Sequence, residues 1–268
     1  MARLCQEANY ILEPDLLSGL REAYDQEVSP IGREILGLLQ ENARVAREEQ
    51  LPICQDTGFA VVFVELGQEV QIAGGDLYEA INSGVRKGYR EGYLRQSVLN
   101  HPLLRVNTGD NTPAVIHLKL VPGEQLKLTV APKGGGSENM SALQMLKPSD
   151  GVQGVKKFVV EVVRNAGSNA CPPVIVGVGI GGTFEKAALM SKEALLRELG
   201  QASATPETAQ LERELLAEIN RLGIGPQGLG GRVTALAVHI ETFPVHLASL
   251  PVAVNLNCHV SRHKKATL

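Results

Sequence analysis

The sequence predicts a mixed α/β fold with short sheets and packed helices. Stretches with apolar residues at helical spacing alternate along the chain with short apolar runs that are typical of buried strands. The 28 glycines and 14 prolines supply many turn signals, and 44% apolar with 21% charged residues is ordinary for a globular domain. At 268 residues the chain can bury one sizeable core or two smaller ones. We therefore expect a single domain over residues 1–268, with two sub-lobes as an option and with a strand order that the sequence leaves open.

The first regular element that we expect is a helix over residues 30–50, where Ile and Leu recur at helical spacing. It ends at LPICQDTG (51–58), whose proline and glycine mark a loop. FAVVFVEL (59–66) is typical of a buried strand, so Cys54 is expected on a helix-to-strand turn. A second helix is expected over residues 76–91.

Two further strands are expected over residues 114–121 and 125–131, separated by a Pro-Gly pair. We expect these two strands to form a hairpin. The segment KGGGS (133–137) is the most flexible-looking part of the chain, and an amphipathic helix is expected over residues 152–165.

From Cys171 onward the sequence predicts a strand, a glycine loop and a helix that is capped by Thr183, with Glu185 in its positive first turn. Another helix is expected to end at Leu222. A glycine-rich loop then returns to a strand, and a last apolar strand opens onto Cys258.

Composition argues against several classes of partner. The formal charge of −3 and the scattered Lys and Arg residues do not favour nucleic acid or an acidic membrane surface. Aromatic residues make up 4% of the chain and Trp is absent, which argues against a base-stacking surface. No apolar run approaches the roughly 18 residues of a membrane span, and the N-terminus does not resemble a signal peptide. We therefore expect a cytoplasmic protein.

Three of the four cysteines, Cys54, Cys171 and Cys258, adjoin predicted loops, whereas Cys5 does not. A cytosolic protein of this size neither needs disulfides nor keeps them oxidised. The separations of 117 and 87 residues exclude a local CxxC knuckle or a ferredoxin-type run. Spacing alone therefore leaves open the common role of a cysteine as a small buried apolar residue.

A competing motif is GVGIGG (177–182), which satisfies the GxGxxG pattern, follows an apolar run and opens a helix. A dinucleotide-binding unit also needs an acidic residue at the end of a second strand, about 20 positions further on. The sequence has a polar link and another helix there. A nicotinamide-dependent dehydrogenase is therefore the weaker hypothesis. The glycines can instead allow tight packing of helix on strand, or the helix N-terminus can face another anion.

The segments LPICQDTG, NACPP with VGIGGT, and NLNCH resemble, in order, the three cluster-ligand motifs of class I fumarases and L-tartrate dehydratases. KGGGSENMS and GGTFEKAALMSKEALLR resemble further segments of that family, so the resemblance covers nearly the whole chain. It implies a mixed α/β lobe in which Cys54, Cys171 and Cys258 bind three irons of a 4Fe-4S cluster. The fourth iron is left open for substrate, so the protein should be sensitive to oxygen.

The resemblance also implies roles for polar residues near these cysteines. It makes Asp56 and His246 candidate catalytic residues, and Gln55, Arg95 and Gly135 candidate substrate-binding residues. Without the resemblance, Asp-Thr-Gly would be a simple turn, and a single histidine or arginine would be a hydrogen-bonded strand end or a solvated charge. The glycine loop would be a flexible turn.

The sequence also contains rival arginines and further histidines. Arg105 and Arg232 are weaker rivals of Arg95 for pairing with a dicarboxylate. We expect the remaining histidines to be hydrogen-bonded structural residues without a catalytic role. They are His101, His117, His239, His259 and His263.

The activity that the resemblance implies is that of a hydro-lyase, most simply the interconversion of fumarate and L-malate in the tricarboxylic acid cycle. L-tartrate dehydration is the alternative, and a noncatalytic iron-sulfur or zinc protein is a further one. Single-chain class I fumarases carry a second domain that this sequence lacks. The resemblance therefore implies a separate β subunit that completes the active site, in an α2β2 assembly.

Overall fold

The computed structural model describes residues 1–268, which divide into two compact units. The first unit comprises Met1–Glu13, Asn42–Gly135 and Arg262–Leu268, and the second comprises Pro14–Glu41 and Gly136–Ser261. Both units combine helices with a four-stranded sheet, so the predicted mixed α/β class is confirmed. The predicted helix at residues 30–50 is α3 (Pro30–Glu49), whose residues belong to both units. None of the helices is long and apolar enough to cross a membrane.

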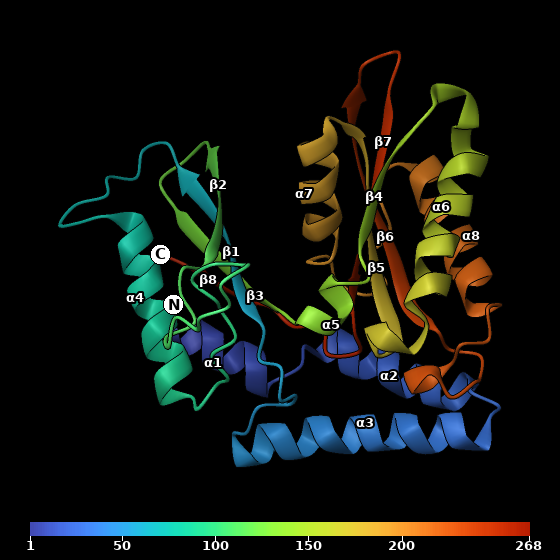
Figure 1. Ribbon diagram of the computed structural model, residues 1–268, viewed down its shortest axis with the longest axis horizontal. Helices are drawn as coiled ribbons and strands as arrows, with labels where there is room; N and C mark the ends of the chain where they lie inside the picture. Colours follow the sequence, from blue (N-terminus) through green and yellow to red (C-terminus); the bar gives the residue numbers. More distant parts are fainter. The chain divides into compact units, whose positions relative to one another are not determined.

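The first unit contains a sheet with the strand order β2-β1-β3-β8 (Figure 1). Its helices, α1 (Ala2–Tyr10) and α4 (Leu77–Glu91), pack against each other, and α1 also packs on β3 and β8. The N-cap residue of α4 is Asp76, whose carboxylate accepts a hydrogen bond from Glu79 N at 2.8 Å. The strands are β1 (Phe59–Gly67), β2 (Val115–Val121), β3 (Leu126–Lys133) and β8 (Lys264–Thr267).

The predicted hairpin of β2 and β3 is wrong, because β1 lies between these two strands. Val61 of β1 faces Val115 of parallel β2 on one side and Ala131 of antiparallel β3 on the other. The physical reason is burial: β1 is largely buried, whereas β2 is mostly exposed. A buried strand needs hydrogen-bonded neighbours on both sides, so β1 takes the central position.

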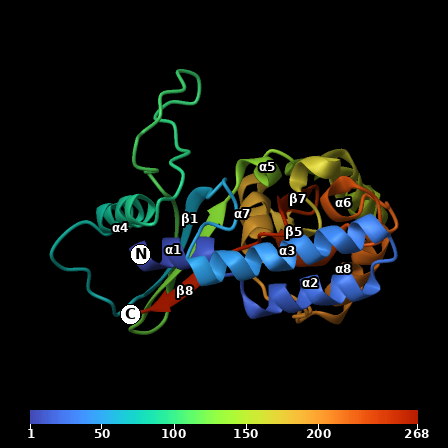
Figure 2. The same ribbon diagram turned by 90° about the horizontal axis from the view of Figure 1, so that it is seen from below.

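The connection between α4 and β2 contains no named helix or strand and extends from the first unit as a long loop (Figure 2). It is nevertheless tied by hydrogen bonds, with an isolated bridge between Leu99 and Asn107. Its tip exposes Leu103 and Leu104, which are 84% and 73% accessible.

The second unit contains a sheet with the strand order β4-β7-β5-β6. The strands are β4 (Ala142–Leu146), β5 (Val174–Gly182), β6 (Ala235–Val245) and β7 (Leu250–Asn257). The helices are α2 (Pro14–Gln26), the single turn α5 (Gly135–Glu138), α6 (Gly151–Ala166), α7 (Phe184–Ala194) and α8 (Pro206–Asn220). The first residue of α5, Gly135, belongs to the first unit. Short 3-10 turns occur at Pro148–Asp150, Gly167–Ala170 and Pro226–Gly228.

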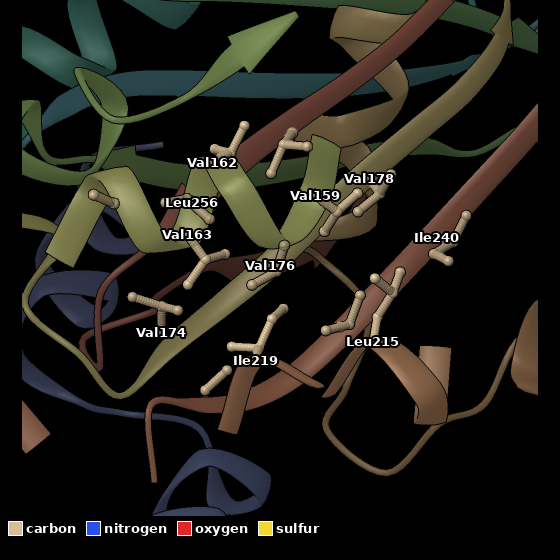
Figure 3. Packing of buried hydrophobic residues seen from close by; sticks show 14 of the residues in the cluster. Val159, Val162, Val163, Val174, Val176, Val178, Leu215, Ile219, Ile240 and Leu256 are labelled. Atoms are coloured by element: carbon tan, nitrogen blue, oxygen red, sulfur yellow. The ribbon is translucent and has the colours of Figure 1, made fainter. Parts of the chain in front are cut away.

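Helix α7 covers one face of this sheet, and α6 and α8 cover the other (Figure 1). Side chains of α6, β5 and α8 interlock in the main apolar core, where Val159, Val176 and Leu215 are completely buried (Figure 3). A helical layer on both faces explains why β5 is an almost continuous apolar run, because neither face of the strand meets water.

The GVGIGG segment lies within strand β5 and is not a separate loop. A Cβ atom on Gly177 would lie 2.1 Å from Ser191 O, and one on Gly179 would lie 2.1 Å from Ala187 O. Both carbonyls belong to α7, so these glycines allow the helix backbone to approach the strand. Tight packing of helix on strand therefore explains this motif.

We predict that Gly179→Ala destabilises the second unit by about 1–3 kcal/mol or more, because the added methyl group overlaps the α7 backbone. Urea unfolding measures this difference. Gly37→Ala in α3 is the matched control, since its Cβ would meet only Tyr24 at an ordinary 3.7 Å. Equal stability of the wild type and the Gly179 variant would show that the close approach is not a constraint.

His239 of β6 is hydrogen-bonded, as predicted, and it is also buried in the second unit. It is 2% exposed, and its Nδ1 lies 3.2 Å from Ala194 O. Nearby, Arg197 is hydrogen-bonded to Glu212, whose carboxylate accepts hydrogen bonds from Ile240 N and Ser203 N. Burial, reinforced by the charge of Arg197, lowers the pKa of His239 to about 4.

This lowered pKa predicts an acid-dependent loss of stability. Between pH 6.5 and about 4 the unfolded chain binds a proton at His239 and the folded protein does not. The free energy of unfolding should therefore fall as the pH is lowered through this window, by about 3 kcal/mol in total. Urea titrations of the wild type and of His239→Gln across the window measure the effect. The same pH slope in both proteins would contradict it.

Candidate functional site

The loop from Ile53 to Gly58 in the first unit carries three of the predicted site residues and is fixed at both ends. Ile53 N donates to Asn9 O at 2.9 Å, and Asn42 Nδ2 donates to Ile53 O at 2.8 Å. At the other end, the hydroxyl of the fully buried Tyr89 lies 2.9 Å from the carbonyl oxygens of both Thr57 and Gly58. The intervening residues therefore have a defined backbone path.

Asp56 is the central residue of this loop. Its Oδ1 accepts a hydrogen bond from Gly58 N at 3.1 Å, and its Oδ2 accepts one from Gly135 N at 2.8 Å. A Cβ on Gly134 would approach Oδ2 to 3.2 Å, so the absence of a side chain there suits the contact. The structure thus brings Asp56 and Gly135 together, and the anion held by this glycine N–H is the Asp56 carboxylate.

Sequence reasoning missed Arg262, which supports the same loop. Its Nη2 donates to the Asp56 carbonyl oxygen, and its side chain is 5% exposed. Nε and Nη1 are buried without a hydrogen-bond partner. Burying a guanidinium group costs free energy. Its contact with the Asp56 carbonyl oxygen therefore indicates that the backbone position of this loop is constrained. No sequence signal could have revealed the contact, because it joins residues 206 positions apart.

The other candidates in this unit lie beside Asp56 in the chain or contact the loop through backbone. The Cys54 thiol donates to Gln55 Oε1 at 3.3 Å, and Gln55 is exposed. Thr57 Oγ1 donates to the Arg95 carbonyl oxygen at 3.1 Å, while the Arg95 residue is exposed to solvent. The loop therefore collects Cys54, Gln55 and Asp56, with Gly135 and the Arg95 backbone as neighbours.

Cys171 and Cys258 meet at one end of the second unit's sheet. Strands β5 and β7 are antiparallel with Ile175 opposite Asn257, so the residues before β5 and after β7 share an edge. The backbone N–H of His259 donates to Cys171 O at 3.3 Å. Cys171 is exposed and has the left-handed conformation φ 52°, ψ 65°, which is sparsely populated by non-glycine residues and is found at functional sites.

The turn between β6 and β7 and the start of α7 lie at the opposite end of this sheet (Figure 1). His246 is in the exposed turn between β6 and β7, where its Nδ1 accepts a hydrogen bond from Ala248 N at 3.2 Å. The eight residues of β7 separate this turn from Cys258 by roughly 25 Å. Within this unit the structure therefore does not bring His246, or the N-terminus of α7, to the two cysteines.

The rival arginines have other positions. Arg105 lies in the exposed loop of the first unit with a positive φ of 53°. In the second unit the backbone N–H of Arg232 donates to both carboxylate oxygens of Glu27, at 3.0 and 2.8 Å. Burial raises the pKa of Glu27, but the backbone N–H of Arg232 and those of Val28, Ser29 and Val233 lower it, and the net shift is downward. Arg232 thus has a structural backbone role here.

The chemistry of the thiols distinguishes Cys5 from the other three. None of the four is in a disulfide, and Cys5 is buried, which raises its pKa to about 12. Cys54 and Cys258 are partly exposed and Cys171 is exposed. Accessible thiols at loops suit metal ligation by thiolate, whereas Cys5 is a packing residue. In neither unit alone does a group of three His, Cys, Asp or Glu side chains come close enough to hold a metal ion.

We predict that iodoacetamide modifies Cys171 rapidly and leaves Cys5 protected until the chain unfolds. A rise in pKa from 9.0 to about 12 lowers the thiolate population of Cys5 by about 1000-fold, and burial adds to the protection. Peptide mass spectrometry of the reduced, metal-free chain measures the rates, with Cys5→Ala as the control for assignment. Comparable labelling rates at the two residues would contradict the distinction.

Comparisons with known proteins agree on one family. The family model described as fumarate hydratase (fumerase) matches residues 1–267. A Methanocaldococcus jannaschii protein named as a candidate L(+)-tartrate dehydratase subunit alpha is 44% identical over 268 residues, covering 98% of this chain and 94% of its own. The L(+)-tartrate dehydratase subunit alpha of Escherichia coli is 36% identical over 258 residues, covering 95% of this chain and 84% of its own.

Proposed function

The chain belongs to the fumarate hydratase (fumerase) family of hydro-lyases, and we propose that it is the α subunit of an L(+)-tartrate dehydratase. The observation that carries this choice is the name of the relatives. Two proteins that match this chain over 94% and 84% of their own length are both named as L(+)-tartrate dehydratase α subunits. The sequence alone predicts fumarate as the substrate, with tartrate as the alternative. The relatives support the alternative better, and hydration of fumarate remains the second candidate because of the family model.

We assign the cofactor of this function as an iron-sulfur cluster, the 4Fe-4S type with one open iron, held by Cys54, Cys171 and Cys258. The thiols fit this assignment because they are accessible and at loops, whereas Cys5 is buried. When bound, such a cluster supplies a Lewis acid that stabilises negative charge on a departing hydroxyl group. It also makes the protein sensitive to oxygen.

The protein's own residues supply proton transfer and substrate orientation in this proposal. Dehydration of tartrate breaks one C–H and one C–O bond, so a base takes the proton and an acid protonates the departing hydroxide to give water. The enol that remains becomes oxaloacetate. The Asp56 carboxyl group, oriented by the N–H groups of Gly58 and Gly135, is our candidate for proton transfer to or from the departing oxygen, as an acid when protonated and as a base when ionised.

Binding of the substrate's carboxylates is assigned to neighbours of Asp56. Arg95 can pair with a carboxylate through two N–H groups, and Gln55 is an exposed amide beside Cys54. Gly135 contributes a backbone N–H to the same region, where it holds Asp56. His246 stays a candidate catalytic residue from the family resemblance alone, since its turn lies at the far end of β7 from Cys258.

The assembly that we propose contains a separate β subunit, because the relatives are named as α subunits. The β subunit would complete the active site, and α2β2 is the expected stoichiometry. The protein base and further substrate arginines are expected on that partner. A cytoplasmic location stays a prediction from the sequence.

The test is an anaerobic assay of the reconstituted α and β subunits with both tartrate enantiomers, fumarate and malate. We expect oxaloacetate from L(+)-tartrate, with kcat/KM at least about 10-fold higher than for fumarate or malate. Selective turnover of fumarate and malate would support the second candidate instead. A cluster-containing complex with no activity on any of the four would argue for a noncatalytic protein.

Asp56→Asn should lower kcat by about 100-fold or more, because the amide cannot transfer the proton although it keeps the shape of the side chain. Steady-state kinetics of the reconstituted complex measure the loss. Asp25→Asn on the exposed side of α2 is the matched control and should behave as wild type. An unchanged kcat in Asp56→Asn would remove Asp56 from the proton-transfer step.

A further inference from the structure

Gln227 lies where three segments of the second unit meet. It belongs to the 3-10 turn Pro226–Gly228, next to the residues that follow Cys171 and those that follow Cys258. Its φ of 53° and ψ of 17° are left-handed, an uncommon conformation for a residue with a side chain. Cys171 also has a left-handed conformation. It is followed directly by Pro172, whose carbonyl oxygen accepts a hydrogen bond from Gln227.

The Pro172 carbonyl oxygen is held twice by Gln227. Both the backbone N and the side-chain Nε2 of Gln227 lie 2.8 Å from this oxygen. The short contact identifies the side-chain atom as the NH2 group, because the opposite amide orientation would place two carbonyl oxygens against each other. This residue therefore fixes the peptide that directly follows Cys171.

The same NH2 group reaches the histidine that follows Cys258. Gln227 Nε2 lies 3.1 Å from His259 Nδ1, which is also 3.1 Å from Cys171 O. The Cys171 carbonyl oxygen also accepts a hydrogen bond from the His259 backbone N–H at 3.3 Å, and its second lone pair would accept one from a protonated Nδ1. The contact with Cys171 therefore favours a proton on Nδ1, and the contact with Gln227 opposes it. Because Pro172 O fixes the orientation of the NH2 group, a proton on Nδ1 would point at an N–H of Gln227. An amide NH2 group is matched at Nδ1 only if that ring nitrogen carries no proton.

We propose that Gln227 is a positioning residue for the Cys171 and Cys258 ligands and that it sets the tautomer of His259. Its NH2 group donates to Pro172 O and to His259 Nδ1, so the ring proton is on Nε2. The link holds the two cysteine-bearing loops in one arrangement before a cofactor binds. The tautomer follows from contacts in the second unit alone. The effect on the cluster rests on the proposed function. Residues that hydrogen-bond around a metal ligand orient that ligand and tune the metal affinity.

The tautomer is tested on the full-length chain, reduced and free of metal, by two-dimensional 15N NMR with labelled histidine. The His259 signals are assigned with His259→Asn. We expect a pyridine-type shift at Nδ1 and a pyrrole-type shift at Nε2. In Gln227→Leu the donor is lost and Cys171 O remains 3.1 Å from Nδ1 as an acceptor, so the proton should move to Nδ1. Gln153→Leu on the exposed surface of α6 is the matched control and should leave the tautomer unchanged.

The positioning role is tested separately with Gln227→Leu, which removes both side-chain hydrogen bonds. We expect loss of cluster absorbance to a chelator under nitrogen to be about 10-fold faster than in the wild type. Urea unfolding of the metal-free chain and the Gln153→Leu control distinguish this effect from a general loss of stability. Unchanged cluster retention in Gln227→Leu would overturn the positioning role.

A wild-type His259 with its proton on Nδ1, or a tautomer that does not respond to Gln227→Leu, would overturn the assignment of the hydrogen bond. These NMR outcomes do not depend on a cluster or a substrate. If the wild-type protein forms no cluster, the proposed function fails while the tautomer experiment still decides the assignment at Gln227.

Discussion

The antiparallel pairing of β5 with β7 is the constraint on which the second unit's site depends. With Ile175 opposite Asn257, the loop that enters β5 and the loop that leaves β7 must lie at the same end of the sheet. Cys171 and Cys258, which are 87 residues apart in the chain, become neighbours for this reason. The parallel pairing of β5 with β6 sends the β6–β7 turn, with His246, to the other end.

The glycine-rich segments serve two different purposes in this fold. In β5 the missing side chains let the α7 backbone approach the strand, so a pattern typical of dinucleotide binding is satisfied by packing. Beside β3 the missing side chains let a backbone N–H reach the Asp56 carboxylate. A glycine motif therefore indicates close approach, and the tertiary structure decides which group approaches it.

Asp56 has the corresponding central position in the first unit. Its carboxylate accepts hydrogen bonds from two backbone N–H groups, and its carbonyl oxygen accepts one from the buried guanidinium of Arg262. These contacts fix the orientation of the carboxylate, which a proton-transfer group needs if it is to act without reorganising. From the sequence alone, Asp-Thr-Gly is typical of a simple turn. The structure contains that turn contact, through Gly58, together with the contact to Gly135.

The sequence by itself determined what depends on local pattern. Helices α3, α4 and α6 and strands β1, β5 and β7 lie where apolar spacing and turn residues predicted them, because these signals act over a few residues. The motifs around the three cysteines identified the family, which the comparisons confirmed. The tertiary structure decided the rest. The central place of β1, the contact of Arg262 with Asp56 and the link from Gln227 to His259 join residues far apart in the chain, and only the packing of buried strands determines which distant segments meet.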